Sequence, residues 1–105
     1  MVRKIKWTIR SLNDLHGIYE FIAKDSKRYA QIQVEDIQNA ALNLVSFPLM
    51  GRVVPEFPHL LYRETLVGNY RVIYRFEEEQ NLIIIIAVAH GRQLLKISQS
   101  GATGI

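Results

Sequence analysis

The sequence predicts an α+β fold: an N-terminal helical hairpin packed on one face of a mainly antiparallel, twisted sheet. Two observations predict it. Residues 62–92 contain three β-rich runs separated by short polar breaks, and residues 9–47 contain two amphipathic helical patterns. One further strand before the helices gives the order β-α-α-β-β-β.

Residues 2–7 alternate roughly between charged and apolar side chains, the pattern of a strand with one buried face. That strand must join the sheet to bury its apolar side, and we expect it beside the last strand. Thr8 follows it and is a residue type that caps helix N-termini.

Residues 9–24 carry one apolar stripe at helical spacing, made of Leu12, Leu15, Ile18, Tyr19 and Ile22. Asp14 and His16 fall beside or opposite this stripe, so we expect them to be solvated. Gly17 lies in mid-helix, where it costs about 1 kcal/mol relative to alanine. Close packing of this helix against a neighbouring element would explain a glycine at position 17.

Asp25 and Ser26 break the helical pattern and offer caps for a second helix at residues 27–47. The apolar stripe of this helix is Ala30, Val34, Ile37, Ala41, Leu44 and Val45. The short break between two amphipathic helices predicts an antiparallel hairpin that covers one side of the sheet.

Residues 48–61 predict a loop or irregular edge, because they hold Gly51 and all three prolines of the chain. The loop carries Arg52, Glu56 and His59. Loops bear functional residues more often than core elements do, although a charged loop residue is usually solvated.

Gly68 and Asn69 predict a two-residue turn between strands at 62–67 and 70–76. Residues 77–81 form a polar break. Residues 82–89 are almost wholly apolar and rich in isoleucine, which predicts a central strand buried on both faces.

The turn fixes the register of the hairpin, so that Val67 faces Tyr70 and each further pair follows outward. One face, expected to be core, carries Thr65, Val67, Tyr70, Val72 and Tyr74; the other carries Tyr62, Glu64, Leu66, Arg71, Ile73 and Arg75. A mid-strand arginine is costly to bury unpaired, so the second face should be open or paired with an anion. Its spacing favours ion pairs of Glu64 with both arginines on a solvated face; the alternative is a basic surface for an acidic partner.

The chain has 105 residues, of which 49% are hydrophobic and 22% are charged, as expected for one globular domain. We expect that domain to span residues 1–98 and residues 99–105 to form a flexible tail. The formal net charge of +3 permits an acidic partner without requiring one.

The chain contains no cysteine, which excludes disulfides, thiolate metal sites and thiol catalysis. His16, His59 and His90 lack metal-ligand spacing, so neither a metal nor another cofactor is expected. No signal peptide is recognisable, and the longest apolar run is too short to span a membrane. These features predict a cytoplasmic protein without a membrane partner.

The remaining chemistry lies in basic and polar groups near the strand ends. Arg71 and Arg75 lie on the second sheet face, His90 and Arg92 follow the central strand, and Glu56 lies in the preceding loop. Arginines can clamp phosphates or carboxylates, and a neighbouring carboxylate or histidine can act as acid or base. Many proteins carry such groups without an active site.

Several short motifs, in a specific order between residues 5 and 95, resemble the RelE/ParE superfamily of toxins from type II toxin–antitoxin systems. The resemblance rests on Trp7-Thr8, Asp14-Leu15, Ile18, residues 19–23, Asp25-Ser26, Ala30, Pro48, Gly51-Arg52, Val54-Pro55-Glu56, Arg63-Glu64, residues 68–74, Val88 and His90-Gly91-Arg92. It implies the fold predicted above.

The resemblance implies one of two functions. ParE-like members poison DNA gyrase and block replication without being known nucleases, whereas RelE-like members cut messenger RNA on the ribosome without a metal. Pro-Glu, Arg-Glu, Gly-Asn-Tyr-Arg and His-Gly-Arg favour the ParE-like branch. On that interpretation no residue is catalytic.

The RelE-like alternative has points for and against it. Arg71 matches the arginine that RelE enzymes place on the phosphate, and Arg92 matches a second one approximately. Tyr62 and Glu64 replace a pair of lysines, and Ser98 replaces a catalytic tyrosine. Another nuclease variant uses a loop glutamate, the shared arginine and a histidine, which Glu56, Arg71 and His90 could imitate.

Both alternatives imply an antitoxin partner and a hetero-oligomer. The antitoxin should bind through an extended segment that folds on the toxin. It should be acidic where it meets Arg71, Arg75, His90 and Arg92, and apolar where it meets the helical hairpin. A third hypothesis is that the toxin is inactive and retains only antitoxin binding or operon regulation.

Overall fold

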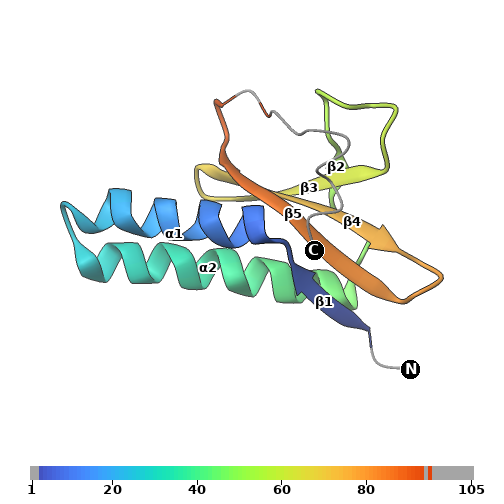
Figure 1. Cartoon of the computed structure of the whole chain (residues 1–105), viewed down its shortest axis with the longest axis horizontal. Coiled ribbons are helices and arrows are strands. Elements are labelled where there is room, and N and C mark those ends of the chain that lie inside the picture. Colours follow the sequence, from blue (N-terminus) through green and yellow to red (C-terminus); the bar gives the residue numbers. More distant parts are fainter. Residues whose placement is uncertain (1–2, 94, 96–105) are drawn as a thin grey trace.

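A computed structural model of the chain describes residues 3–93 and residue 95. It confirms the predicted α+β fold, with a helical hairpin on one face of a sheet (Figure 1). The predicted tail at residues 99–105 lies outside the described residues. The elements are β1 (Lys4–Trp7), α1 (Ile9–Ala23), α2 (Lys27–Ser46), β2 (Arg52–Val53), β3 (Tyr62–Val67), β4 (Tyr70–Glu77) and β5 (Leu82–His90).

The sheet has the strand order β1-β5-β4-β3-β2. The first strand lies beside the last, as predicted, and runs parallel to it, while the other pairs are antiparallel. Every residue of β5 except its last is buried, which confirms that this strand is central. The short strand β2 was not predicted separately; it forms the irregular edge expected within residues 48–61.

Side-chain caps fix where each helix begins. Thr8 Oγ1 accepts a hydrogen bond from the Ser11 amide at 3.1 Å and donates to the Ile86 carbonyl at 3.0 Å. Ser26 caps α2 by accepting from the Tyr29 amide. The Thr8 cap therefore also ties the start of α1 to β5.

Three expectations for α1 were wrong. Leu12 is 51% exposed, because α1 turns Ser11 and Leu15 toward the core instead. Asp14 is held rather than solvated: its carboxylate accepts from the Val88 amide at 3.0 Å and fastens α1 to β5. Gly17 packs against nothing, since a Cβ there would have no neighbour within 4 Å.

The hairpin register is confirmed pair by pair, from Val67 with Tyr70 to Tyr62 with Arg75. Gly68 takes the positive φ of 57° that the turn requires and that glycine adopts without strain. The face predicted to be core packs under the helices, where Val72 and Tyr74 join Ile37, Leu44, Ile83 and Ile85.

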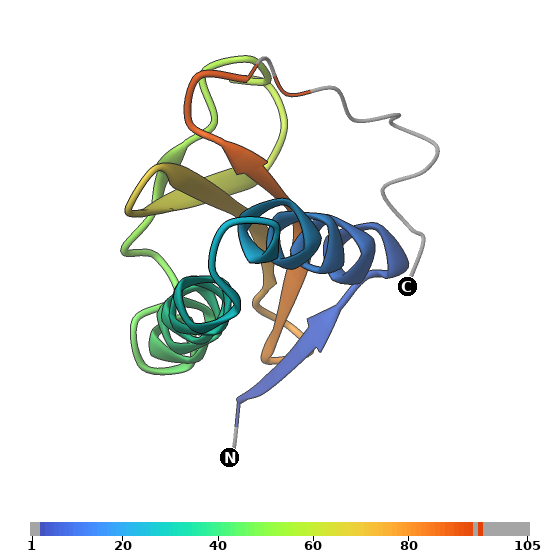
Figure 2. The ribbon, with the colours of Figure 1, turned by 90° about the vertical axis from the view of Figure 1, so that its left-hand side faces the viewer.

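The second face of the sheet is covered, which corrects the expectation of a solvated surface. Figure 2 shows the loop between β2 and β3 and the end of β5 on the side of the sheet away from the helices. Val54, Phe57 and Leu60 from this loop, together with Leu95, pack with Ile73 of β4 and with Ile84 and Ile86 of β5. This second apolar layer buries the central part of the face.

Candidate functional site

Arg71 lies at the centre of a polar cluster beneath the covering loop. Its guanidinium approaches Glu64 of β3 at 2.9 Å (Nε to Oε1) and 2.5 Å (Nη2 to Oε1). Glu56 of the loop meets it in a forked arrangement, with both Nη–Oε distances at 2.8 Å. Arg71 is only 5% exposed, so the ion pair that the sequence predicted is buried rather than solvated.

All the donors of Arg71 are used. A guanidinium has five N–H groups. Two hydrogen bonds go to Glu64, two to Glu56, and the fifth goes from Nη1 to the Gln93 carbonyl at 3.3 Å. In this arrangement Arg71 has no N–H left for a phosphate.

Glu56 joins the loop to the segment that follows β5. Its Oε2 accepts from the Leu95 amide at 3.0 Å in addition to Arg71. The hydrogen bonds from Arg71 lower the pKa of Glu56 from 4.5 to about 2. The same pairing raises the pKa of Arg71. A carboxylate with such a low pKa is a weak general base at neutral pH.

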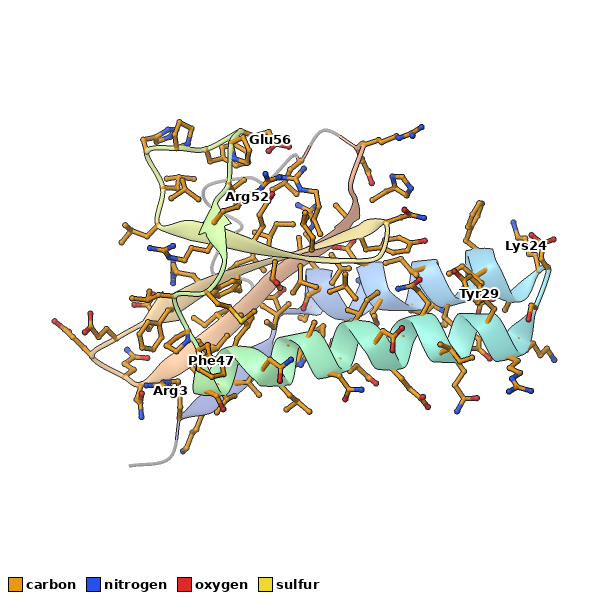
Figure 3. The ribbon with its side chains drawn as sticks, turned by 180° about the vertical axis from the view of Figure 1, so that it is seen from behind. Arg3, Lys24, Tyr29, Phe47, Arg52 and Glu56 are labelled. Atoms are coloured by element: carbon orange, nitrogen blue, oxygen red, sulfur yellow. The ribbon has the colours of Figure 1, made fainter. Side chains whose placement is uncertain are left out.

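Arg52 completes the cluster from the edge strand. Its Nε lies 2.6 Å from Glu64 Oε2, so both oxygens of Glu64 face arginines. Figure 3 shows Arg52 and Glu56 on the side of the sheet away from the helices. Two arginines and two glutamates balance in charge, which makes burial of Glu64 and Arg71 tolerable, while the side chain of Arg52 stays largely exposed.

The sequence places Arg52 in a loop and in the Gly51-Arg52 motif, but it does not predict the contact of Arg52 with Glu64. Its place in the cluster depends on the pairing of β2 with β3, in which Arg52 faces Glu64. No local pattern in residues 48–61 reveals that pairing.

The sequence suggested that Glu64 pairs with both Arg71 and Arg75, but Arg75 does not contact Glu64 in the structure. It forms an ion pair with Glu77 on its own strand, Nε to Oε1 at 2.6 Å, although the groups lack hydrogen-bond geometry. Its side chain is mostly shielded from solvent. Arg75 is thus separate from the cluster around Arg71.

His90 and Arg92 lie at the exposed end of β5. His90 Nδ1 accepts from the Arg92 amide at 3.2 Å, and its ring packs edge-on against Tyr70 with the centroids 5.6 Å apart. His90 pairs with Tyr70 in the sheet, whereas Arg71 pairs with Ala89. Because successive strand residues point to opposite faces, the His90 ring and the Arg71 cluster lie on different faces.

The structure therefore brings together only two of the three residues that could form a nuclease site, Glu56, Arg71 and His90. Glu56 and Arg71 touch, and His90 points to the helix side. All the same, a hollow of about 230 Å³ at the strand ends is lined by Arg52, Leu66, Gly68, Asn69, Tyr70, Arg71, His90, Gly91 and Arg92.

A second hollow, of about 370 Å³, lies between α1 and the ends of β4 and β5. It is lined by Asn13, Asp14, Gly17, Ile18, Phe21, Tyr70, Val88, His90 and Gln93. Gly17 leaves the helix surface bare there, and Phe21 is exposed beside it. The lining combines apolar side chains with the polar side chains of Asn13, Asp14, His90 and Gln93.

Within residues 3–93 and 95, no group of three His, Asp or Glu side chains comes together as a metal site. The described residues also contain no helix that is long and apolar enough to cross a membrane.

Comparison with known proteins defines the class. The family model described as "ParE toxin of type II toxin-antitoxin system, parDE" matches residues 5–95. This chain belongs to that family, and it is a ParE-type toxin of a type II toxin–antitoxin system. No curated protein sequence matches it.

Solved structures share the fold. The chromosomal ParDE system of P. aeruginosa has a TM-score of 0.68 at 22% identity, over 85% of this chain and 96% of that one. The RelBE2 toxin–antitoxin complex of Mycobacterium tuberculosis has 0.64 at 21%, over 86% and 99%. A mutant of the E. coli toxin RelE in the free state has 0.62 at 14%, over 88% and 86%. At these identities the likeness shows the fold, which ParE and RelE toxins have in common.

Proposed function

We propose that this toxin inhibits DNA gyrase and blocks replication, and that a cognate antitoxin neutralises it. The observation that favours gyrase inhibition over RNA cleavage is that every N–H group of Arg71 is hydrogen-bonded within the chain. The arginine that a RelE-like enzyme would turn toward phosphate donates all five N–H groups to the chain itself. This favours an inhibitor that acts by binding over a nuclease.

The carboxylate beside it supports the same choice. Glu56 has a pKa of about 2 and accepts from both Arg71 and the Leu95 amide. Freeing it for proton transfer would break the ion pair that holds the loop. We therefore assign Glu56, Glu64 and Arg71 a structural role.

The test is supercoiling of relaxed plasmid by purified gyrase, with toxin added from substoichiometric amounts to excess. The proposal expects supercoiling to stop near stoichiometric toxin. Toxin premixed with its antitoxin is the matched control and should leave supercoiling unaffected. Full supercoiling at excess of a toxin that still arrests growth in cells would refute the gyrase target.

Ribosome-dependent cleavage of messenger RNA is the second candidate. The observation that favours it is the basic hollow at the strand ends, where Arg52, His90 and Arg92 remain exposed. A nuclease working there would depend on His90 and Arg92 rather than on the buried Arg71. If the double variant His90→Ala/Arg92→Ala no longer cleaves messenger RNA and Glu56→Gln cleaves it as wild type does, that mechanism is identified.

Antitoxin binding is proposed for two surfaces. The groove between α1 and the strand ends offers Ile18, Phe21 and Val88 to an apolar partner segment. The exposed His90 and Arg92 would meet its acidic residues. Arg75 and especially Arg71 contribute less than the sequence suggested, because each already faces a carboxylate of the chain.

A further inference from the structure

We propose that a second copy of the chain covers an apolar corner of the sheet, so that the toxin without antitoxin forms a dimer with twofold symmetry. The corner is a hollow of about 320 Å³ whose lining includes Leu49, Val53, Leu61, Arg63, Phe76 and Glu78. None of its lining residues lines the hollow beside α1 or the hollow at the strand ends. The dimer therefore uses a surface separate from those proposed above for the antitoxin and for messenger RNA.

The corner lies on the face of the sheet that carries the helices, at a place that the helices leave open. Val53 pairs with Arg63 and Arg63 pairs with Tyr74, so these side chains share one face. Phe76 lies two positions after Tyr74 and points the same way. Both aromatic residues pack with the core beneath the helices, which identifies the face. Because α2 ends at Ser46, it does not continue over this corner.

Large apolar side chains are exposed in and around the corner. Leu61, in its lining, is 84% exposed. The segment that leaves α2 and enters β2 adds four more exposed apolar residues, Phe47, Leu49, Met50 and Val53. Figure 3 labels Phe47 at the end of α2. Exposed apolar residues that gather around a concavity mark a protein interaction site.

Two opposite charges line the same hollow without an ionic partner. Among residues 3–93 and 95, neither Arg63 nor Glu78 forms an ion pair. Nη1 of Arg63 donates to the Gly51 carbonyl at 2.7 Å, a neutral acceptor that leaves the positive charge uncompensated. Arg63 pairs with Tyr74, and Glu78 comes four residues after Tyr74, so the two backbone positions are roughly 13 Å apart along the strand direction. The hollow thus has a positive and a negative charge at separate positions.

This charge pattern is complementary to itself under a twofold rotation. In an isologous dimer, residue i contacts residue j and residue j contacts residue i. Arg63 of each copy then meets Glu78 of the other, while Leu61 of each copy enters the hollow of the other against Leu49 and Val53. An apolar centre with a charged rim is the common anatomy of protein interfaces. The contact uses side chains and needs no backbone pairing between strands.

The same pattern disfavours a partner of a single charge. An acidic segment would satisfy Arg63 and be repelled by Glu78, and a basic segment would do the reverse. A second copy of the chain supplies both charges at the required spacing.

The first test measures the mass of the full-length toxin, purified away from its antitoxin, by analytical ultracentrifugation. We expect wild-type toxin to be a dimer at a concentration of about 100 μM. Leu61→Glu places a carboxylate in the apolar centre, at a position too exposed to affect folding. It should raise the dissociation constant of the dimer at least about tenfold. Leu42→Glu changes an exposed leucine on α2 and is the matched control, which should leave that constant within about twofold of wild type.

A charge exchange tests the twofold arrangement itself. Arg63→Glu and Glu78→Arg each bring like charges together in a dimer of identical copies, so each variant alone should be monomeric. An equal mixture of the two variants restores an opposite pair at both contacts and should dimerise as wild type does. Dimerisation of the mixture would also show that both variants fold.

Three results would overturn the proposal. One is a wild-type toxin that is monomeric at about 100 μM. Another is a dimer that Leu61→Glu leaves intact, or a mixture of the charge variants that stays monomeric although both have the circular dichroism of wild type. The third is a monomeric toxin whose affinity for antitoxin falls in Leu61→Glu, which would assign the corner to the antitoxin.

Discussion

Replacing Glu56 with glutamine tests whether the Arg71 cluster holds the fold together. The variant keeps the shape of the side chain and removes the charge that pairs with Arg71. Lowering a pKa from 4.5 to about 2 corresponds to about 3 kcal/mol of folding free energy at neutral pH. The carboxylate is 20% exposed, and solvent screening reduces this to about 2 kcal/mol.

The pH dependence has a definite sign. The pKa of Glu56 is lower in the folded chain, so its stabilisation is fully present above pH 4.5 and is lost as the pH falls toward 2. Wild-type toxin should therefore lose stability across that window. Glu56→Gln should show a smaller loss there, because its side chain does not titrate.

The assay is urea unfolding followed by circular dichroism, at pH 7 and at steps between pH 5 and pH 2.5. Glu79→Gln, at an exposed position of the turn after β4, is the matched control and should unfold like wild type. Equal unfolding free energies for Glu56→Gln and wild type at pH 7 would refute the structural role of the cluster.

Three substitutions test other parts of the fold by the same unfolding assay. Gly17→Ala should stabilise the toxin by about 1 kcal/mol, because the added Cβ meets nothing within 4 Å and the helix gains propensity; destabilisation would contradict this. Gly51→Ala should destabilise it by about 2 kcal/mol or more, since a Cβ there would lie 2.6 Å from the Glu64 carbonyl oxygen and 2.7 Å from the Tyr74 hydroxyl; a neutral result would show that β2 can shift. Thr8→Ala should cost about 1–2 kcal/mol through loss of the cap and of the bond to Ile86, whereas Thr8→Ser, which keeps the hydroxyl, should recover most of that loss.

The sequence predicts those features that depend on neighbouring residues. Gly68 and Asn69 fix the hairpin register, because a two-residue turn allows the flanking strands only one pairing register. Thr8 and Ser26 identify the helix starts for the same local reason. The apolar run of β5 predicts its central place, since only a strand covered on both faces buries so many isoleucines.

What the sequence misses depends on contacts between distant segments. Arg71 is buried because the loop between β2 and β3 covers it and places Glu56 against its guanidinium. No local sequence pattern predicts the path of that loop. Asp14 is held by the Val88 amide, a partner 74 positions away. Leu12 fits the helical stripe on α1 as well as its neighbours do. The packing of α1 on the sheet decides that Ser11 is buried and that its neighbour Leu12 is 51% exposed.

We propose that this toxin acts on gyrase and not on messenger RNA. The most direct measurement is the amount of linear plasmid released by detergent and protease after incubation with purified gyrase, ATP and wild-type toxin. If the toxin acts on gyrase, the amount of linear DNA should rise with toxin and linear DNA should be absent when antitoxin is added first. The contrary result is no linear DNA at any toxin concentration, together with messenger cleavage by the same preparation on programmed ribosomes.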